Sequence, residues 1–321
     1  MDLIKIATEF ATEESCLAYL EKARWPEGVR CIASRDGQPC GSDRISRIVT
    51  KGGTRKNGRN IPVRRLFQCL DCGFQFTAKA GTLFNDSHLS LQKWFFATAL
   101  MTNAKKGLSA KQLQRDLKVS YQTAWYLAHR IREAMESEEG VFGGTVEMDE
   151  FFHGGRFDAR RHQYRNDKQP IMGIVQRGIA ENHSKVVAFP IPNRGKAVVS
   201  EVVHEYIAND ARIVTDEWSS YRQLKKTHNH AIVIHSRGEY VRGDVHTNSI
   251  EGFWSLFQRC VIGQHHFVSI KHLQRYLNQS AFSYNNRKVG NLFGVVIARL
   301  AIGVALPYAK LTSGPSASPR R

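Results

Sequence analysis

The stretch Thr145–Phe152, TVEMDEFF, decides the fold class. Its branched and aromatic residues predict a strand, yet Asp149 lies in the middle of it. A buried carboxylate without a partner costs several kcal/mol, so the chain needs a reason to place an acid there. The neighbouring Glu147 and Glu150 are also compatible with solvated charges on one face of the strand.

The segments after this strand alternate between strand and helix. We expect further strands in residues 170–178, 185–191, 211–218 (ARIVTDEW) and 230–236 (HAIVIHS), with an amphipathic helix in residues 195–210. Three strands, a helix, a fourth strand, a fifth strand and closing helices follow one another in the order of an RNase H-like fold. The sequence therefore predicts an α/β domain over residues 143–303, with a mixed sheet flanked by helices.

A second acid, Asp216, ends the apolar run RIVTD. It lies at the carboxyl end of a buried strand, the edge where open α/β sheets bind ligands. If the first and fourth strands are neighbours, Asp149 and Asp216 converge, and a divalent cation partners both. Magnesium prefers one or two carboxylates together with water and phosphate oxygens. The alternative is that Asp216 caps the turn into residues 217–221.

The stretch Val245–Arg259, VHTNSIEGFWSLFQR, sets a polar cluster at the start of an apolar helical pattern. One interpretation is capping, in which Asn248 or Ser249 accepts backbone N–H groups and Glu251 completes a capping box. The other is that Asn248 or Glu251 completes the metal site, with His246 orienting a ligand or contacting phosphate. Two metal ions about 4 Å apart would then clamp the oxygens of a phosphoryl displacement.

Four of the six cysteines form two pairs, each ending in Cys-Gly. Between the pairs, residues 44–69 contain two alternating β-like runs around a Gly and Asn-Gly turn region. This pattern predicts a zinc ribbon over residues 29–84 with a structural Zn²⁺ held by Cys31, Cys40, Cys69 and Cys72. The first pair is separated by eight residues instead of two to four, so four unrelated thiols remain the alternative.

Residues 88–138, between the predicted ribbon and the predicted α/β domain, have a helical pattern. Residues 1–28, before the ribbon, are a separate N-terminal helical segment. Ser109 caps a helix that ends near Leu117, and a second helix begins near Tyr121. This rhythm predicts a helix-turn-helix whose second helix enters the DNA major groove, although a simple helical hairpin is an alternative. The candidate DNA contacts are Ser120, Tyr121, Gln122, Thr123, Arg130, His246 and Arg259.

The composition favours a polyanionic partner. Lys and Arg total 46 against 29 acidic residues, a formal charge of +17, so nucleic acid is the first candidate and an anionic membrane surface the second. No apolar run reaches about eighteen residues, and the N-terminus lacks the order of a signal peptide. We expect a cytosolic protein with no membrane partner and a basic, low-complexity tail over residues 304–321.

Five motifs in order make the chain resemble the insertion-sequence transposases of the ISXO-two-like group. The similarity runs from about residue 30 to about residue 303. The resemblance implies a zinc ribbon, a helix-turn-helix and a DDE-type RNase H-like catalytic domain. The motifs are CLDCGFQFTAKAGTLF (69–84), VEMDEFFHGG (146–155), IVTDEWSSY (213–221), VHTNSIEGFWSLFQR (245–259) and HHFVSIKHLQRYLNQSAFSYNNR (265–287).

The resemblance places the first two catalytic aspartates on Asp149 and Asp216. The third residue is glutamate in related enzymes, but many members of the group carry asparagine in the HTN position, which is Asn248 here. Glu251 is its rival, since the two lie 32 and 35 positions after Asp216 (248 − 216 and 251 − 216). The position of a usual basic residue on this helix is occupied by Gln258.

The implied activity is metal-dependent DNA nicking and strand transfer with two Mg²⁺ or Mn²⁺ ions held by Asp149, Asp216, Asn248 and Glu251. The implied partners are double-stranded DNA, as terminal inverted repeats and target, and further copies of the chain on that DNA. The expected location is the prokaryotic cytoplasm, at the nucleoid when DNA is bound. A catalytically impaired DNA-binding regulator and an RNase H-like nuclease are the competing functions.

Overall fold

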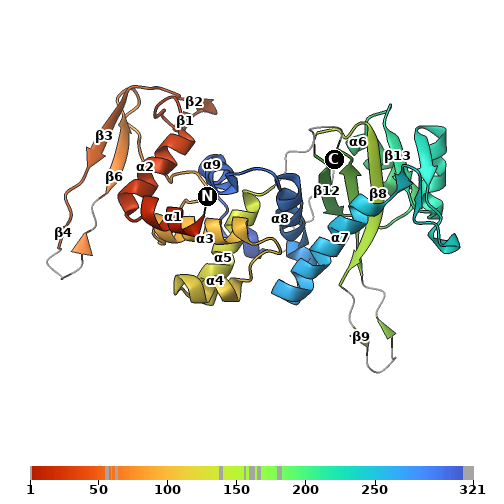
Figure 1. Cartoon of the computed structure of the whole chain (residues 1–321). Coiled ribbons are helices and arrows are strands. Elements are labelled where there is room, and N and C mark those ends of the chain that lie inside the picture. The colour runs from red at the N-terminus through yellow and green to blue at the C-terminus, as the bar shows by residue number, and fades with distance from the viewer. Residues whose placement is uncertain are drawn as a thin grey trace. The chain divides into compact units, whose positions relative to one another are not determined.

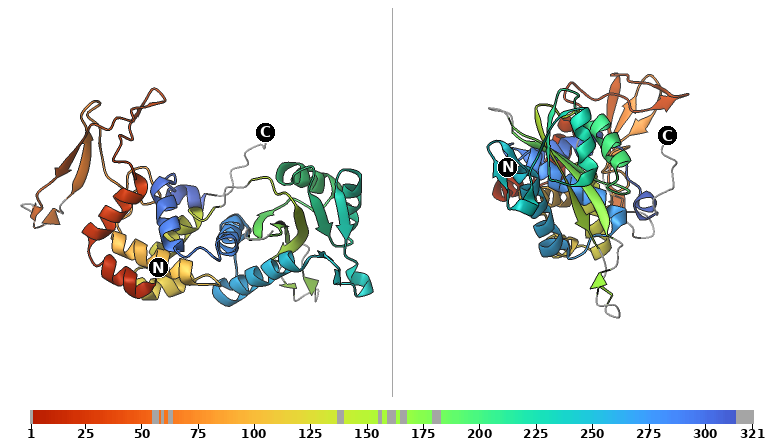
Figure 2. Two further views of the ribbon diagram at one scale, coloured as in Figure 1. Left: turned by 45° about the horizontal axis from the view of Figure 1, so that its top comes forward. Right: turned by 90° about the vertical axis from the view of Figure 1, so that its right-hand side faces the viewer.

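The computed structural model describes residues 2–54, 58, 60–61, 64–136, 140–154, 157–158, 163–164, 168–178 and 183–313. The chain forms two compact units, which are described separately (Figures 1 and 2). The first comprises residues 1–100 and 291–312, and the second contains residues 101–290. The last residues of the predicted tail, 314–321, lie outside the described residues.

The first unit contains the N-terminal helices and the last helices of the chain. Helix α2 packs on α9, and the rings of Phe10, Phe95 and Phe293 meet with centroids 4.8 to 5.7 Å apart. The predicted catalytic domain ran to residue 303, whereas in the structure α9 packs with the first hundred residues. These helices are α1 (Leu3–Glu9), α2 (Glu13–Arg24), α3 (Leu91–Asn103, whose end passes the unit boundary), α9 (Leu292–Ile302) and α10 (Tyr308–Thr312).

The ribbon is a small sheet in which β6 pairs antiparallel with β3 and β7. A separate hairpin, β1–β2, turns at Asp36 and Gly37, whose φ angles of +51° and +78° are those of a two-residue turn. This hairpin explains the eight residues between Cys31 and Cys40. The strands are β1 (Ser34–Arg35), β2 (Gln38–Pro39), β3 (Ile45–Val49), β4 (Gly53–Thr54), β5 (Asn60–Ile61), β6 (Arg65–Cys69) and β7 (Gln75–Phe76).

The second unit begins with the predicted helix pair. Helices α4 (Ala110–Leu117) and α5 (Tyr121–Glu133) begin after the N-caps Ser109 and Ser120, which confirms the predicted helices. Most of the later half of α5 is buried, in part against α8 (Leu273–Asn285). There Arg132 Nε donates a hydrogen bond of 2.7 Å to Gln279 Oε1.

The five-stranded sheet of the second unit has the order β12-β11-β8-β13-β14. Strand β11 is antiparallel to β8 and β12, whereas β13 is parallel to β8 and β14. In chain order this is 3-2-1-4-5, the arrangement of an RNase H-like sheet, as predicted. The strands are β8 (Thr145–His153), β11 (Gln169–Gln176), β12 (Lys185–Pro190), β13 (Arg212–Thr215) and β14 (Asn229–Ile232).

Helices cover both faces of this sheet (Figure 1). Val146 and Met148 of β8 pack with α6 on one face. Ile171 and Val175 of β11 pack with α7 and α8 on the other. The remaining elements are α6 (Lys196–Tyr206), α7 (Asn248–Cys260), the short helices η1 (Ser219–Lys226), η2 (His235–Arg237), η3 (Val261–His265) and η4 (Ile270–His272), and the strand pairs β9 (Phe157–Asp158), β10 (Gln163–Tyr164), β15 (Val241–Arg242) and β16 (Val245–His246).

Gly173 allows α7 to lie close to the sheet. A Cβ atom at this position would lie 2.4 Å from the ring of Trp254 and 2.7 Å from Ile250. The residue that pairs with Gly173 across the strands is Asp149. The glycine therefore brings α7 to the strand that carries the first candidate acid.

Among the described residues, no helix combines the length and the apolar character needed to span a bilayer.

Candidate active site

The register of two parallel strands brings Asp149 and Asp216 to one level of the sheet. Thr145 pairs with Arg212 and Glu147 with Val214, a constant offset of 67 residues (212 − 145 = 214 − 147 = 67). The pairing ends at Val214, and the same offset continued by two residues would set Asp216, the first residue after β13, against Asp149. The charge of Asp216 acts on Asp149, as expected of neighbouring acids.

Asp149 is a partly buried acid on the face of β8 that α7 covers. Its Oδ2 accepts a hydrogen bond of 3.1 Å from Trp254 Nε1. Burial, and then the charges of Asp216 and Glu150, raise the pKa of Asp149 to about 7, and the charge of Glu251 adds to this effect. A carboxylate surrounded by other acids gains most from a divalent cation, so this donor set suits Mg²⁺ or Mn²⁺.

Asp216 is held by the turn that follows it. Its Oδ1 accepts the backbone N–H of Trp218 at 2.9 Å, which confirms that Asp216 caps this turn. Burial raises the pKa of Asp216, while the charges of His235 and Arg194 oppose that rise. The cap fixes the side chain beside Asp149, so capping and a metal-binding role are compatible.

The start of α7 is capped by an acid from β8. The N-cap residue is Thr247, which makes no side-chain cap hydrogen bond, so the predicted caps by Asn248 or Ser249 are wrong. Instead, Glu147 Oε2 accepts the backbone N–H groups of Ser249 at 2.8 Å and Ile250 at 3.0 Å. The carboxylate stabilises the positive end of the helix dipole and joins β8 to α7.

Glu147 is completely buried, so its interpretation as a solvated strand-face charge is wrong. Its Oε1 accepts a hydrogen bond of 2.6 Å from Arg177 Nε. Arg177 Nη2 also lies 3.1 Å from Nδ1 of His246. His246 therefore belongs to the buried network at the start of α7. The alternation of Glu147 with Asp149 on one strand face was the only sequence signal for this role.

Asn248 and Glu251, the two candidates for the third metal ligand, differ in their surroundings. Both Asn248 and Glu251 are exposed. Glu251 Oε1 accepts the hydroxyl of Thr247 at 2.6 Å and lies 3.5 Å from His235 Nε2, and its charge acts on Asp149. Asn248 is the first residue of α7. The structure thus brings the α7 carboxylate into the electrostatic environment of Asp149.

The candidate DNA contacts on α5 separate into two groups. Ser120, Tyr121 and Gln122 are exposed at the start of the helix and Thr123 is half-buried, with Ser120 Oγ accepting the Thr123 N–H at 3.1 Å. Arg130, by contrast, is only 4% exposed and donates to Tyr126 Oη at 2.8 Å. Its burial against the helix pair removes it from that surface.

The last candidate DNA contact, Arg259, is exposed in the final turn of α7. Gln258 beside it is exposed as well. Residues that the sequence did not single out lie closer to the acids: Trp254 binds Asp149, and Arg194 stacks over Trp218 with 3.5 Å between the guanidinium carbon and the ring centroid.

The four predicted zinc ligands come together in the ribbon. The Sγ atoms of Cys31 and Cys72 are 3.5 Å apart, those of Cys40 and Cys69 are 3.9 Å apart, and all four lie within 4.8 Å of one another. Tetrahedral zinc with Zn–S bonds of about 2.3 Å requires sulfur atoms about 3.8 Å apart. The alternative of four unrelated thiols is therefore wrong.

The protein shifts the pKa values of the thiols in different directions. The backbone N–H of Cys72 is the largest cause that lowers the pKa of Cys69 to about 6, whereas burial raises the pKa of Cys31 to about 12. Within the described part of the chain, the cysteines are the only group of three or more Cys, His, Asp or Glu side chains whose ligand atoms lie this close. The acids around Asp149 are spaced more widely.

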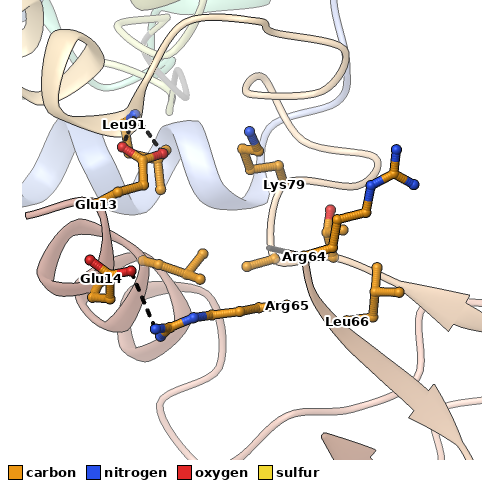
Figure 3. Close-up of a pocket in the computed structure, with 10 residues that line it drawn as sticks. Glu13, Glu14, Arg64, Arg65, Leu66, Lys79 and Leu91 are labelled. Atoms are coloured by element: carbon orange, nitrogen blue, oxygen red, sulfur yellow. Dashed lines mark hydrogen bonds and ion pairs between the residues drawn. The ribbon is translucent and has the colours of Figure 1, made fainter. Parts of the chain in front are cut away.

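A cavity of about 390 Å³ lies in the first unit between α2 and the start of β6 (Figure 3). Glu14 and Arg65 form an ion pair of 3.4 Å on its wall, and Glu13 accepts the backbone N–H of Leu91. Lys79 and Arg64 also line the cavity. Two acidic and three basic residues line this cavity.

Comparisons with known proteins match two parts of the chain. Residues 141–285 match the ISXO2-like transposase domain, and residues 11–75 match the transposase zinc-ribbon domain. An uncharacterized protein in transposable element ISH50 of Halobacterium salinarum is 28% identical over 285 residues, which cover 84% of this chain and 89% of that relative.

A solved structure of a simian T-cell lymphotropic virus intasome in complex with PP2A regulatory subunit B56 gamma contains a similar chain. It is 12% identical, with a TM-score of 0.29, and the match covers 64% of this chain and 75% of that one. A TM-score this low carries no argument, and the fold assignment rests on the strand order.

Proposed function

We propose that this chain, which belongs to the ISXO2-like transposases with a zinc-ribbon domain, binds the terminal inverted repeats of its own element and catalyses their nicking and strand transfer. The proposal is supported by the β8–β13 register together with the effect of the Asp216 charge on Asp149. Acids at one level of adjacent parallel strands suit a divalent cation and a phosphodiester.

Asp149 and Asp216 would hold Mg²⁺ or Mn²⁺, which supplies charge stabilisation to the oxygens of the phosphodiester when bound. Trp254 keeps Asp149 oriented through its indole N–H. Glu251 completes the ligand set in preference to Asn248, because a neutral amide binds a cation less strongly than a carboxylate and the charge of Glu251 already acts on Asp149. Asn248, a neutral amide at the first position of α7, would have the lesser part in binding the cation.

The four thiolates of the ribbon would hold structural Zn²⁺, as their spacing supports. Zinc here contributes folding energy, because so small a sheet buries little apolar surface. Bound zinc would make the ribbon a rigid module. The ribbon and the helix pair would both recognise DNA.

DNA binding is supported by the charge of +17 and by the exposed polar residues Ser120, Tyr121 and Gln122 at the start of α5. Residues at the N-terminal end of the second helix are those that reach base edges in a helix-turn-helix. Strand transfer joins two element ends to a target, so the DNA-bound form is at least a dimer. We place it at the nucleoid in the cytoplasm.

The test is strand transfer with the full chain, Mg²⁺ or Mn²⁺, and a duplex carrying the inverted repeat that flanks the gene. Asp216→Asn should abolish nicking and transfer and leave binding of the duplex intact. The matched control is Asp210→Asn, an exposed acid in the turn before β13, which should keep full activity. Undiminished transfer by Asp216→Asn would refute the assignment, and a wild type that binds without transfer would support a regulator instead.

A further inference from the structure

We propose that Arg194 binds a phosphate of the DNA strand held at the acidic site, a role that rests on the proposed function. Arg194 lies in the loop between β12 and α6, immediately before Gly195, the N-cap of α6. No motif of the sequence points to it. Three contacts, two made by Arg194 and one made by Trp218, connect it to Asp216.

The first contact is a stacked aromatic platform. The guanidinium carbon of Arg194 lies 3.5 Å from the ring centroid of Trp218 and 5.1 Å from that of Phe152. Stacking fixes the plane of the guanidinium and leaves the N–H groups at its edge directed away from the rings. The side chain is thus held without using its hydrogen-bond donors.

The second and third contacts tie this platform to the acid. The backbone N–H of Trp218 donates to Asp216 Oδ1 at 2.9 Å, and Ser220 Oγ donates to the carbonyl oxygen of Arg194 at 2.8 Å. The side chain and the backbone of Arg194 are therefore both anchored to residues 216–220. A ligand bound by Asp216 lies within the reach of this arginine.

The charge of Arg194 acts on the acids, although among the described residues its guanidinium forms no ion pair with them. It is among the causes that lower the pKa of Asp216 and of Glu150. Within the part of the chain that the structure describes, however, no acceptor takes a hydrogen bond from its guanidinium. A cation with free, coplanar donors beside two acids matches the bidentate geometry of a phosphate.

The other arginines near the acids are already engaged. Arg177 donates to Glu147 and to the backbone oxygens of Asp244 and His246. Arg212 pairs with Asp244. Arg259 is the one basic residue of α7 and lies in its last turn. Arg194 is therefore the arginine best placed to neutralise charge on a phosphodiester at Asp216.

The experiment uses the full chain and a duplex with the flanking inverted repeat. Arg194→Gln should lower strand transfer in Mg²⁺ by about 100-fold, the usual loss of one electrostatic donor to a transition state. Binding of the same duplex, measured in Ca²⁺ over a salt series, should lose about one unit of the slope of log K against log salt. Arg194→Lys should keep that slope and still lose most of the transfer, because lysine lacks the planar fork.

The matched control is Arg222→Gln, which removes an exposed arginine of η1 and should change neither readout. An Arg194→Gln protein with wild-type transfer and an unchanged salt slope would overturn the role of Arg194 and leave the proposed function standing. A wild type that binds the duplex but never transfers it would instead overturn the proposed function, and loss of slope in Arg194→Gln would still support the phosphate contact.

Discussion

The ribbon and the acidic site are two candidate metal centres built in opposite ways. The ribbon draws its four thiols from neighbouring turns of one small fold, and their sulfur atoms lie within 4.8 Å of one another. The acidic site draws Asp149, Asp216 and Glu251 from a central strand, a strand end and a helix, which are widely separated in the chain. A structural site is closed by protein ligands alone, whereas a catalytic site keeps positions for water and substrate.

The two centres also differ in the spacing and the electrostatics of their ligands. In the ribbon, backbone N–H groups lower the pKa of Cys69 to about 6, whereas burial raises the pKa of Cys31 to about 12. At the acidic site, burial and neighbouring acids raise the pKa of Asp149 to about 7, so this carboxylate gains from a bound cation. Closely spaced thiols suit a structural zinc ion, whereas more widely spaced carboxylates suit ions that share their coordination with phosphate oxygens.

The largest effect is expected at the ribbon. Cys69→Ser should abolish zinc binding and unfold the ribbon, because a structural zinc contributes about 10–16 kcal/mol to the folding of such modules. Metal analysis should find one zinc per wild-type chain and none in the variant, while the sheet of the second unit keeps its thermal transition. Cys16→Ser, a buried thiol outside the cluster, should retain zinc. Full zinc content in Cys69→Ser would contradict the assignment of Cys69 as a ligand of a structural zinc ion.

The next largest effect is expected at Glu147, the buried carboxylate that joins β8 to α7. Glu147→Ala removes the acceptor for the start of α7 and leaves Arg177 without its buried partner, so the free energy of unfolding should fall by about 3–5 kcal/mol. Glu147→Gln should cost less, since one carbonyl oxygen remains to accept an N–H. Chemical denaturation measures both. A loss of stability no larger than that of an exposed pair, about 1 kcal/mol or less, would contradict the role.

A smaller effect is expected from the glycine under α7. Gly173→Ala places a Cβ against Trp254, and overpacking of this kind costs about 1–3 kcal/mol. Because Trp254 donates to Asp149, strand transfer should fall as well. Gly252→Ala is the control: its Cβ meets nothing within 4 Å, and alanine in a helix should stabilise by up to about 1 kcal/mol. Equal stability of the two variants would mean that α7 does not depend on this close approach.

Local patterns in the sequence predicted the elements and the pair of aspartates. Branched and aromatic residues predicted β8, an apolar run predicted β13, and the cap Ser109 predicted α4, while α5 begins near Tyr121 as predicted. The convergence of Asp149 and Asp216 was expected if the first and fourth strands were neighbours, and β8 and β13 are neighbours in the sheet. These features depend on neighbours in the chain or on a rule of connection. The Asp36-Gly37 turn was also readable in the sequence and explains the long first knuckle.

Features that depend on packing could not be predicted. Glu147 caps a helix 102 positions away, so the pattern of its own strand did not indicate its partner. Arg194 is a loop residue whose partners, Trp218 and Phe152, come from separate elements. Likewise, the apolar pattern of α9 shows that it is buried but not which core buries it. The spacings of Asn248 and Glu251 from Asp216 did not decide between them, and the contacts of Glu251 with Thr247 and His235 depend on packing.

The most direct test of the shared cation site is a titration with Mn²⁺, followed by electron paramagnetic resonance, on the zinc-loaded chain bound to the duplex. The account predicts that Asp149→Asn and Asp216→Asn each weaken Mn²⁺ binding by about 10- to 100-fold or more, since both remove direct ligands. Mn²⁺ affinity equal to wild type in both variants would show that these two carboxylates hold no common ion.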